Sequence, residues 1–211
     1  MPKDEQLLPR WLVWAREIQA LSQTGLTFTV NEFDRQRFER LREMAAEIFA
    51  HHADMPAEFW SQQFGAQEGY ATPKIDVRGA VIRDSKILLV QEKSDRRWCM
   101  PGGWGDVGEK PSAMVAREVR EESGFEVRPR KIIGIFDANR DGRPMSFFHA
   151  YKIIFLCDII GGEARPSEET LAVDFFAFDR LPPLSSSRTH PRHLQEIRLH
   201  LEDESRHAAY D

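Results

Sequence analysis

A glycine-rich loop that leads into an acidic helix, between residues 103 and 125, constrains the fold of this chain more than any other segment. Ser112 is a residue type that caps helix N-termini, and Gly124 supplies a C-terminal stop. About three turns of helix lie between them, with one apolar stripe that holds Val115, Ala116 and Val119. The sequence therefore predicts a helix that packs through one face and leaves another face free to border a cleft.

Three carboxylates share a second stripe of this helix. At about 100° per residue, positions i, i+3 and i+4 lie close together on the surface, and Glu118, Glu121 and Glu122 occupy them. Like charges at this spacing repel one another, and a hard divalent cation would remove that penalty. Mg²⁺ and Mn²⁺ suit oxygen ligands, and Mg²⁺ is usually shared with substrate phosphates. The stripe therefore predicts a Mg²⁺ or Mn²⁺ site for diphosphate chemistry; the plainer alternative is a solvated acidic helix face.

The whole segment resembles the Nudix box, G-x5-E-x7-R-E-U-x-E-E-x-G-U with U an aliphatic or bulky apolar residue, at each specified position. The resemblance implies an α+β fold, in which a mixed β-sheet lies in an α/β/α sandwich. It also implies an activity, which is the hydrolysis of a nucleoside diphosphate linked to another moiety, X.

The same resemblance implies roles for individual residues of the box. Its metal ligands would be Glu118 and Glu122, with Glu121 as a further ligand or a water-orienting partner and Gly103 contributing its main-chain carbonyl. Glu109 and Arg117 would form an internal ion pair that fixes the loop against the helix, although a plain surface salt bridge is the alternative for that pair.

The hydrophobic period changes from helical to strand-like near residues 65 to 72. We therefore expect a helical N-terminal domain over residues 1–70 and the hydrolase domain over residues 71–211. Apolar spacing in the first domain predicts three helices: one that ends at Gly25, one that begins near Asn31 or Asp34, and a short one after Pro56.

Apolar runs in the second domain predict a hairpin that turns at Asp84-Ser85-Lys86. The other predicted elements are strands near Val127 and over residues 132–135, 147–156 and 175–178, and a final helix over residues 194–201. Cys99 and Cys157 lie beside apolar runs, so we expect two buried free thiols.

The N-terminal segment is similar to that of Nudix hydrolases that carry a dedicated helical domain. The similarity runs from Trp11 to Arg42 and resumes over residues 72–78. Members of this subgroup are described as ADP-ribose or CDP-choline pyrophosphatases and look dimeric, so the resemblance implies a homodimer. It does not fix the substrate, because loops outside the box recognise X.

Candidates for the remaining roles lie outside the box, except for Trp104, which follows its first glycine. Several Nudix hydrolases place a general base on a later loop, which makes Glu169 the first candidate and Glu168 its rival, unless both are solvated loop carboxylates. Arg78 is either a phosphate contact or a structural ion-pair partner. Three aromatic residues could stack on a base or could simply pack: Trp104, Phe28 and Tyr70.

The composition of the chain argues against some classes of binding partner. The 211 residues carry a formal net charge of −5 at pH 7, which argues against a stable nucleic-acid partner held by backbone electrostatics. The sequence contains no signal peptide and no run of 18 apolar residues, so we expect a cytoplasmic protein with no membrane partner.

The sequence is also compatible with other functions. The enzyme could be an RNA-end pyrophosphatase or an exonuclease. The helical domain could instead read DNA, which would make the protein a nucleotide-sensing regulator with a Nudix-like domain, although its charges are mixed rather than basic. A third alternative makes the helical domain a dimerisation element that takes no part in the active site.

Overall fold

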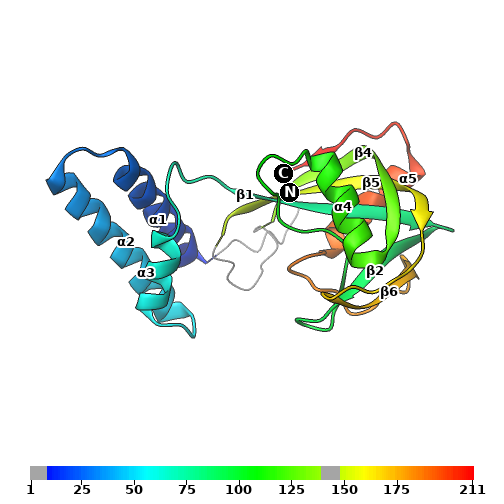
Figure 1. Cartoon of the computed structure of the whole chain (residues 1–211), viewed down its shortest axis with the longest axis horizontal. Coiled ribbons are helices and arrows are strands. Elements are labelled where there is room, and N and C mark those ends of the chain that lie inside the picture. Colours follow the sequence, from blue (N-terminus) through cyan, green and yellow to red (C-terminus); the bar gives the residue numbers. More distant parts are fainter. Residues whose placement is uncertain (1–8, 139–147) are drawn as a thin grey trace. The chain divides into compact units, whose positions relative to one another are not determined.

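The computed structural model describes residues 9–138 and 148–211, which belong to two compact units (Figure 1). The helical unit comprises Met1–Pro73 together with Asn139–His149, and the sheet unit comprises Lys74–Ala138 and Ala150–Asp211. Phe147, where a predicted strand begins, lies outside the described residues. Each unit has its own core, so we describe each by itself.

Three helices form the described core of the helical unit: α1 (Arg10–Phe28), α2 (Glu32–His52) and α3 (Ala57–Gly65). Asn31 caps α2, because its side chain accepts hydrogen bonds from the main-chain N–H groups of Phe33 and Asp34. The predicted start of the second helix is therefore confirmed. Side chains from all three helices are buried together, namely Leu12, Ala15, Ala45, Ala46, Phe49 and Phe64.

The predicted end of the first helix is wrong. Helix α1 continues through Gly25 to Phe28. The ring of Phe38 on α2 occupies the space that a Cβ atom at position 25 would need, so this glycine permits close packing of two helices rather than terminating one.

The sheet unit contains a mixed β-sheet and two helices. Its strands are β1 (Lys74–Arg83), β2 (Lys86–Glu92), β3 (Trp98–Cys99), β4 (Phe125–Asp137), β5 (Ala150–Gly162), β6 (Thr170–Ala177) and β7 (Ala209–Tyr210), and its helices are α4 (Pro111–Ser123) and α5 (Pro191–Glu202). The strand order is β3-β2-β1-β5-β4-β7, and β6 also pairs with β2. Strands β1 and β5 are parallel, whereas β1 and β2 form an antiparallel hairpin.

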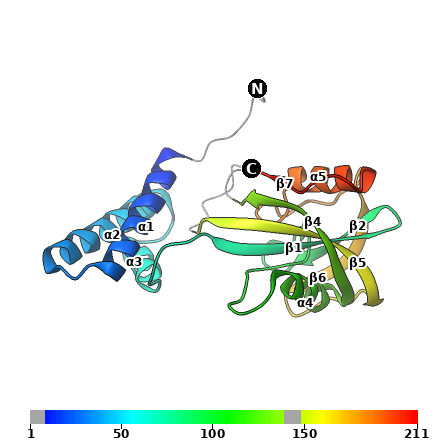
Figure 2. The same ribbon diagram turned by 90° about the horizontal axis from the view of Figure 1, so that it is seen from above.

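Helices α4 and α5 cover opposite faces of the sheet (Figure 2). Alternate residues of β1 explain this arrangement, since Val77 and Val81 pack in the core with α4, whereas Ala80 packs in the core with α5. The expected α/β/α sandwich is therefore confirmed. Both cysteines, Cys99 and Cys157, are buried free thiols as expected.

The predicted hairpin is confirmed, because Asp84 and Ser85 alone connect β1 to β2 and both adopt positive φ angles of 51° and 59°. The predicted cap of the acidic helix is wrong. Helix α4 begins at Pro111 after Lys110, with no side-chain cap, so Ser112 lies inside the helix. Its predicted end is confirmed, since Gly124 adopts a φ of 80° and its N–H bonds to the Arg120 carbonyl oxygen.

Candidate active site

The loop that leads into α4 is held against β1 by main-chain hydrogen bonds. The N–H of Gly79 bonds to the carbonyl of Pro101 (2.9 Å), and the N–H of Val77 bonds to the carbonyl of Gly103 (2.9 Å). Gly102 has a φ of 140°, and a Cβ atom there would overlap the Val77 carbonyl oxygen. Only glycine therefore lets this loop lie so close to the strand, with the N–H of Gly102 directed toward α4.

Two glutamates of α4 are partly or fully shielded from solvent at this loop. Glu122 is buried, and its Oε2 accepts a 2.9 Å hydrogen bond from the N–H of Gly102. Burial raises the pKa of Glu122 to about 7, and burial also raises the pKa of Glu118. A Cβ atom at position 103 would lie 3.1 Å from Oε2 of Glu118, so that carboxylate sits directly over Gly103.

Arg117 binds the acidic groups on the outer side of the box. Its guanidinium contacts Glu109 at 2.8 Å, Glu118 at 2.9 Å and Glu121 at 2.9 Å. The aspartate Asp106 lies 3.3 Å away. The ion pair expected between Glu109 and Arg117 is thus present, and it lowers the pKa of Glu109 through its hydrogen bonds.

These residues suit a hard cation by the chemistry of their donors. The stripe of α4 offers carboxylate oxygens, and two of the carboxylates are desolvated, so a divalent charge would stabilise their ionised forms. Within the described residues, no three Asp, Glu, His or Cys side chains are arranged to hold a metal ion. Glu118 and Glu121 turn instead toward Arg117, and the Gly103 carbonyl already accepts one hydrogen bond.

The segment that carries Glu168 and Glu169 is tied to α4. Thr170 donates a hydrogen bond from Oγ1 to the carbonyl oxygen of Glu122 (3.0 Å). Lys93 contacts the same segment twice, because its N–H bonds to the Glu169 carbonyl (3.1 Å) and its Nζ to the Glu168 carbonyl. Both glutamate side chains are exposed. The two candidate bases therefore lie on an anchored loop next to the end of the box helix.

Arg78 is engaged in a buried ion-pair network. Its Nε and Nη2 atoms bind the two carboxylate oxygens of Asp76 at 2.8 and 3.1 Å, and its Nη1 donates to the Met100 carbonyl. Lys152 also binds Asp76 (3.1 Å). Burial alone would raise the pKa of Asp76, but the charges of Arg78 and Lys152 lower it below its usual value. This geometry favours the structural alternative for Arg78 over a phosphate contact.

The aromatic candidates divide between the two units. Trp104 belongs to the sheet unit, where it lies in the box loop, forms a single β-bridge with Asp76 and leaves about half of its surface exposed. Phe28 and Tyr70 belong to the helical unit and are 67% and 70% exposed. A hydrogen bond from the Gly69 N–H to Thr27 Oγ1 (3.0 Å) joins their two segments.

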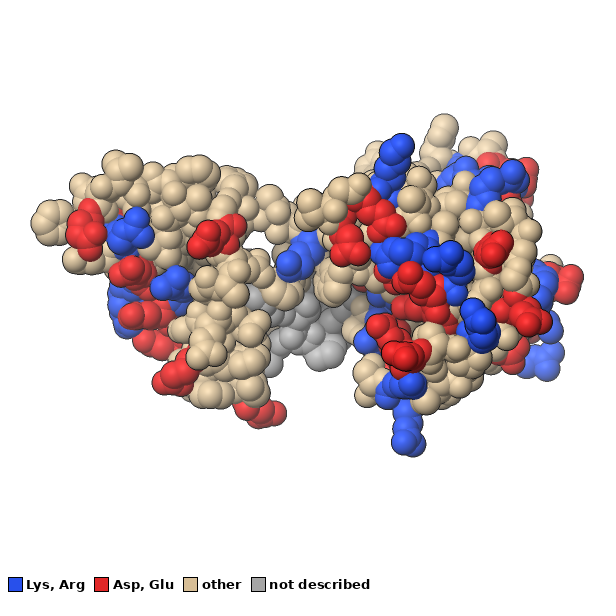
Figure 3. All heavy atoms as spheres, in the orientation of Figure 1, with Lys and Arg blue, Asp and Glu red and all other residues tan. Residues whose placement is uncertain are grey.

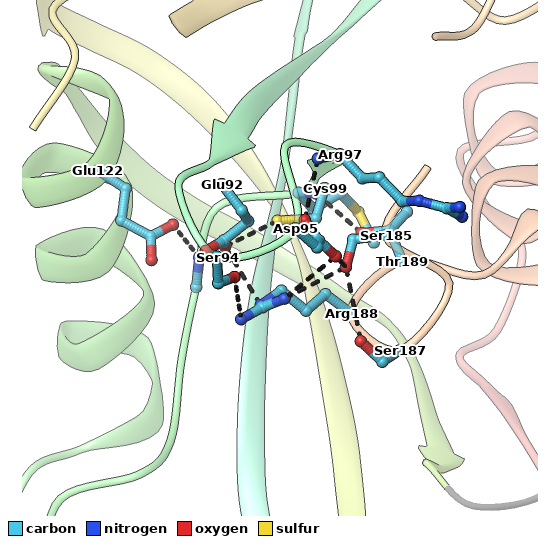
Figure 4. A network of polar contacts seen from close by, with 12 residues as sticks. Glu92, Ser94, Asp95, Arg97, Cys99, Glu122, Ser185, Ser187, Arg188 and Thr189 are labelled. Atoms are coloured by element: carbon cyan, nitrogen blue, oxygen red, sulfur yellow. Dashed lines mark hydrogen bonds and ion pairs between the residues drawn. The ribbon is translucent and has the colours of Figure 1, made fainter. Parts of the chain in front are cut away.

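Two residues of the site were not foreseen from the sequence. Glu92, at the end of β2, is buried, and its negative charge adds to the burial that raises the pKa of Glu122. Arg188 lies 3.3 Å from Glu92, and Figure 4 shows it reaching from the segment before α5 toward the side of Glu122. Glu92 could have been predicted as a site residue, because an acidic residue closely follows the apolar strand Ile87–Val90. No neighbouring residue in the sequence indicates a role for Arg188.

Acidic and basic side chains are interspersed on the face of the molecule in Figure 3, without a continuous basic surface. None of the helices in the described residues is long and apolar enough to cross a membrane.

Two family models match the chain. The model described as a NUDIX domain matches residues 73–197, and the model described as a UDP-X-like, N-terminal oligomerisation domain matches residues 9–61. A protein of Bacillus subtilis (strain 168), named provisionally as the ADP-ribose pyrophosphatase YjhB, is 38% identical over 188 residues, which is 89% of this chain and 90% of that protein.

Two solved structures are also similar. A UDP-X diphosphatase has a TM-score of 0.62 and 31% identity, covering 96% of this chain and 98% of that one. An ADP-ribose pyrophosphatase from Streptococcus suis 89-1591 has a TM-score of 0.61 and 36% identity, covering 66% of this chain and 100% of that one.

Proposed function

Because this chain belongs to the Nudix hydrolase family, we propose that it is a metal-dependent enzyme that cleaves a nucleoside diphosphate linked to X. The products would be a nucleoside monophosphate and a phosphorylated X. The observation that carries the proposal is the pair of desolvated carboxylates, Glu118 and Glu122, placed on one stripe of α4 against the glycine loop.

We assign Glu118 and Glu122 as the main ligands of Mg²⁺ or Mn²⁺, with Glu121 and the Gly103 carbonyl as further oxygen donors. A divalent cation supplies neutralisation of the phosphoryl charge, which a diphosphate requires before a nucleophile can approach. Arg117 keeps the stripe in place, since it binds Glu109 of the loop and Glu118 of the helix at once. Glu121 remains about half exposed, which suits a residue that orients water.

Glu169 is our choice for the general base. The attacking water would give a proton to its carboxylate as the new P–O bond forms, and the bridging P–O bond would break to release the other phosphate. Two contacts support this choice, because the Thr170 bond to Glu122 and the Lys93 bond to Glu169 hold the loop at the box. Glu168 is the alternative on the same loop.

ADP-ribose is our first choice of substrate, because two similar proteins carry that activity in their names. A UDP-linked substrate is the second, because the similar UDP-X diphosphatase covers nearly the whole chain. Trp104 is the exposed aromatic residue of the box loop to which we assign base stacking.

A substrate panel tests this proposal. The panel contains ADP-ribose, CDP-choline, a UDP-sugar and a capped RNA oligomer, each with Mg²⁺, with Mn²⁺ and with a chelator. When the reaction is run in ¹⁸O-labelled water, mass spectrometry of both products shows which one contains ¹⁸O and so identifies the phosphorus that water attacks. We expect cleavage of a small nucleotide that stops with the chelator. Cleavage of the RNA alone would make the enzyme an RNA-end pyrophosphatase, and no cleavage of any substrate would contradict the proposal.

We further propose that the helical unit forms a homodimer through α1. Trp14, Leu21 and Phe28 recur every seven residues, so they lie along one stripe of the helix, and all three are more than half exposed. Large apolar side chains in such a row are typical of an interface between subunits. Phe28 would then serve the dimer rather than stack on a base.

A further inference from the structure

Arg188 differs from the other two arginines of the site in how its charge is used. Arg117 contacts four carboxylates, and Arg78 is buried with a bidentate bond to Asp76. Arg188 donates hydrogen bonds to the hydroxyl groups of Ser185 (3.2 Å) and Ser94 (3.3 Å), which are neutral acceptors. Two of the hydrogen bonds of its guanidinium are therefore made to neutral groups rather than to carboxylates, and an anion could replace these hydroxyl groups as the acceptor.

The acidic neighbours of Arg188 are placed less tightly. Its Nε lies 3.3 Å from Glu92 and its Nη1 lies 3.6 Å from Asp95, beyond an ideal charge-assisted hydrogen bond. The side chain is 31% exposed, whereas that of Arg78 is 5% exposed. A guanidinium that is partly open to solvent and held by weak contacts can exchange them for a stronger anion.

The backbone that carries Arg188 is rigidly anchored. Lys152, which is fully buried, donates from Nζ to the carbonyl of Arg188 (2.9 Å) and also binds Asp76. The next residue, Thr189, accepts a hydrogen bond at Oγ1 from the N–H of Met100 (2.8 Å), directly before the glycine loop of the box. The segment is thus held by Lys152 of β5 and by Met100 before the box loop, while the guanidinium remains partly exposed.

Arg188 also lies on the side of the sheet unit that carries the carboxylates of α4. Glu92 lies between the two parts of the site, because it contacts Arg188 (3.3 Å) and also accepts a hydrogen bond from the thiol of Cys99 (3.2 Å). Cys99 comes shortly before Gly102, whose N–H bonds to Glu122. Figure 4 shows the guanidinium of Arg188 below Ser94, on the side of the network where Glu122 lies. A diphosphate that approached the carboxylates of α4 would meet this cation.

We propose that Arg188 is the phosphate-binding arginine of the site, which exchanges its bonds to Ser94 and Ser185 for a bidentate contact with the diphosphate of the substrate. This inference rests on the proposed function for the identity of the substrate, but binding of a diphosphate group can be measured without turnover. The planar guanidinium matches two phosphoryl oxygens, which the ammonium group of a lysine does not.

The test is calorimetric titration of the full-length protein with methylenediphosphonate, which is a diphosphate analogue that cannot be hydrolysed, in the presence of Mg²⁺. We expect Arg188→Gln to weaken binding by about tenfold to a hundredfold, which is the usual range for a lost hydrogen bond to a charged group. Arg188→Lys should recover part of the loss. Arg180→Gln, at an exposed turn, removes the same charge and should leave binding within about twofold of wild type.

Asp95→Asn separates binding from a purely structural role. It removes an acidic neighbour of Arg188 and keeps an oxygen that can accept the hydrogen bond from Ser185. If Arg188 binds phosphate, this variant should bind the analogue as tightly as wild type or more tightly. Equal weakening in Asp95→Asn and Arg188→Gln would overturn the inference, because it would mean that Arg188 only joins two loops.

Four further outcomes are decisive. If Arg188→Gln binds within about twofold of wild type, or if wild type does not bind the analogue, the inference is wrong. If binding depends on Arg188 but wild type cleaves no nucleoside diphosphate derivative, the proposed function fails while the phosphate site stands. Should Arg188→Gln fail to fold, Arg188→Lys takes its place in the comparison with Asp95→Asn. Equal weakening of analogue binding in these two variants would then overturn the inference.

Discussion

The hydroxyl group of Thr170 donates a hydrogen bond of 3.0 Å to the main-chain carbonyl oxygen of Glu122. This bond joins the first residue of β6 to the last turn of α4. The loop that precedes Thr170 is therefore anchored beside a proposed metal ligand, although Thr170 and Glu122 are 48 residues apart in the sequence. The arrangement gives the two groups of glutamates separate positions, and substitutions can distinguish their roles.

Replacing Glu122 tests the metal site. Glu122→Gln keeps the side-chain volume and the hydrogen bond from Gly102 but removes a charged ligand. We expect turnover to fall about a thousandfold, which corresponds to about 4 kcal/mol of transition-state stabilisation. Steady-state rates at saturating Mg²⁺ provide the measurement, and turnover close to that of wild type would rule out Glu122 as a ligand.

The same substitution should stabilise the metal-free protein. Burial raises the pKa of Glu122 from 4.5 to about 7, so the folded state binds its proton more tightly than the unfolded state. The stabilising effect of that protonation is present at low pH and is lost as the pH rises from 4.5 to about 7. Above pH 7, Glu122→Gln should therefore raise the free energy of unfolding by up to about 3 kcal/mol.

Urea unfolding in a chelator at pH 5 and pH 8 measures this effect. The difference between Glu122→Gln and wild type should be larger at pH 8 than at pH 5. Glu126→Gln, at an exposed position of β4, is the matched control and should change little at either pH. A loss of stability in Glu122→Gln at pH 8 would contradict the expectation.

Replacing Glu169 separates the base from the metal ligands. Glu169→Gln should lower turnover by about a hundredfold to ten-thousandfold, the usual contribution of a positioned base. Affinity for Mn²⁺ should be almost unchanged, because α4 would still hold the ion. Glu168→Gln is the neighbouring control. If Glu168→Gln shows the larger loss, the two assignments must be exchanged, and if Glu169→Gln weakens Mn²⁺ binding, Glu169 is a ligand.

Replacing Asp76 tests the buried ion pairs. Asp76→Asn leaves Arg78 and Lys152 buried without their carboxylate, so we expect a loss of about 3 to 5 kcal/mol in the free energy of unfolding. Asp158→Asn, a partly exposed position on β5, should cost less than about 1 kcal/mol. Thermal unfolding of the three proteins gives the comparison, and equal melting temperatures for both variants would refute it.

Replacing Leu21 tests the dimer. Leu21→Glu places a charge in the exposed stripe of α1 and should convert a dimer to a monomer in multi-angle light scattering. Gln36→Glu adds the same charge at an exposed position of α2 and should leave the mass unchanged. A wild-type protein that is a stable monomer at micromolar concentration would exclude the proposed interface.

Features that depend on neighbours in the sequence were predicted well. The box identified the Nudix family, the two-residue turn at Asp84 fixed the first hairpin, and the periodicity separated helices from strands. Two helix ends were misjudged for physical reasons. Pro111 lacks an N–H and fits the first helical position without a cap, and Gly25 serves the close approach of Phe38.

Features that depend on tertiary contacts could not be predicted. Strand β7 has two residues, which is too short for any periodic signal. Arg188 is placed by contacts from distant parts of the chain, since Lys152 bonds to its carbonyl and Met100 bonds to the hydroxyl of the next residue, Thr189. Likewise, the sequence left two roles open for Arg78, and its bidentate bond to Asp76 favours one of them.

The charges of Asp76 and Lys152 also select the alignment of two strands. The two residues are direct partners in the parallel pairing of β1 with β5, where many neighbouring side chains are apolar. Apolar pairs tolerate displacement along a strand, because one aliphatic contact can replace another. A slip of one residue would set Asp76 beside Tyr151 or Ile153 and turn every side chain of the strand to the opposite face. The buried charge pair thus penalises misaligned sheets during folding.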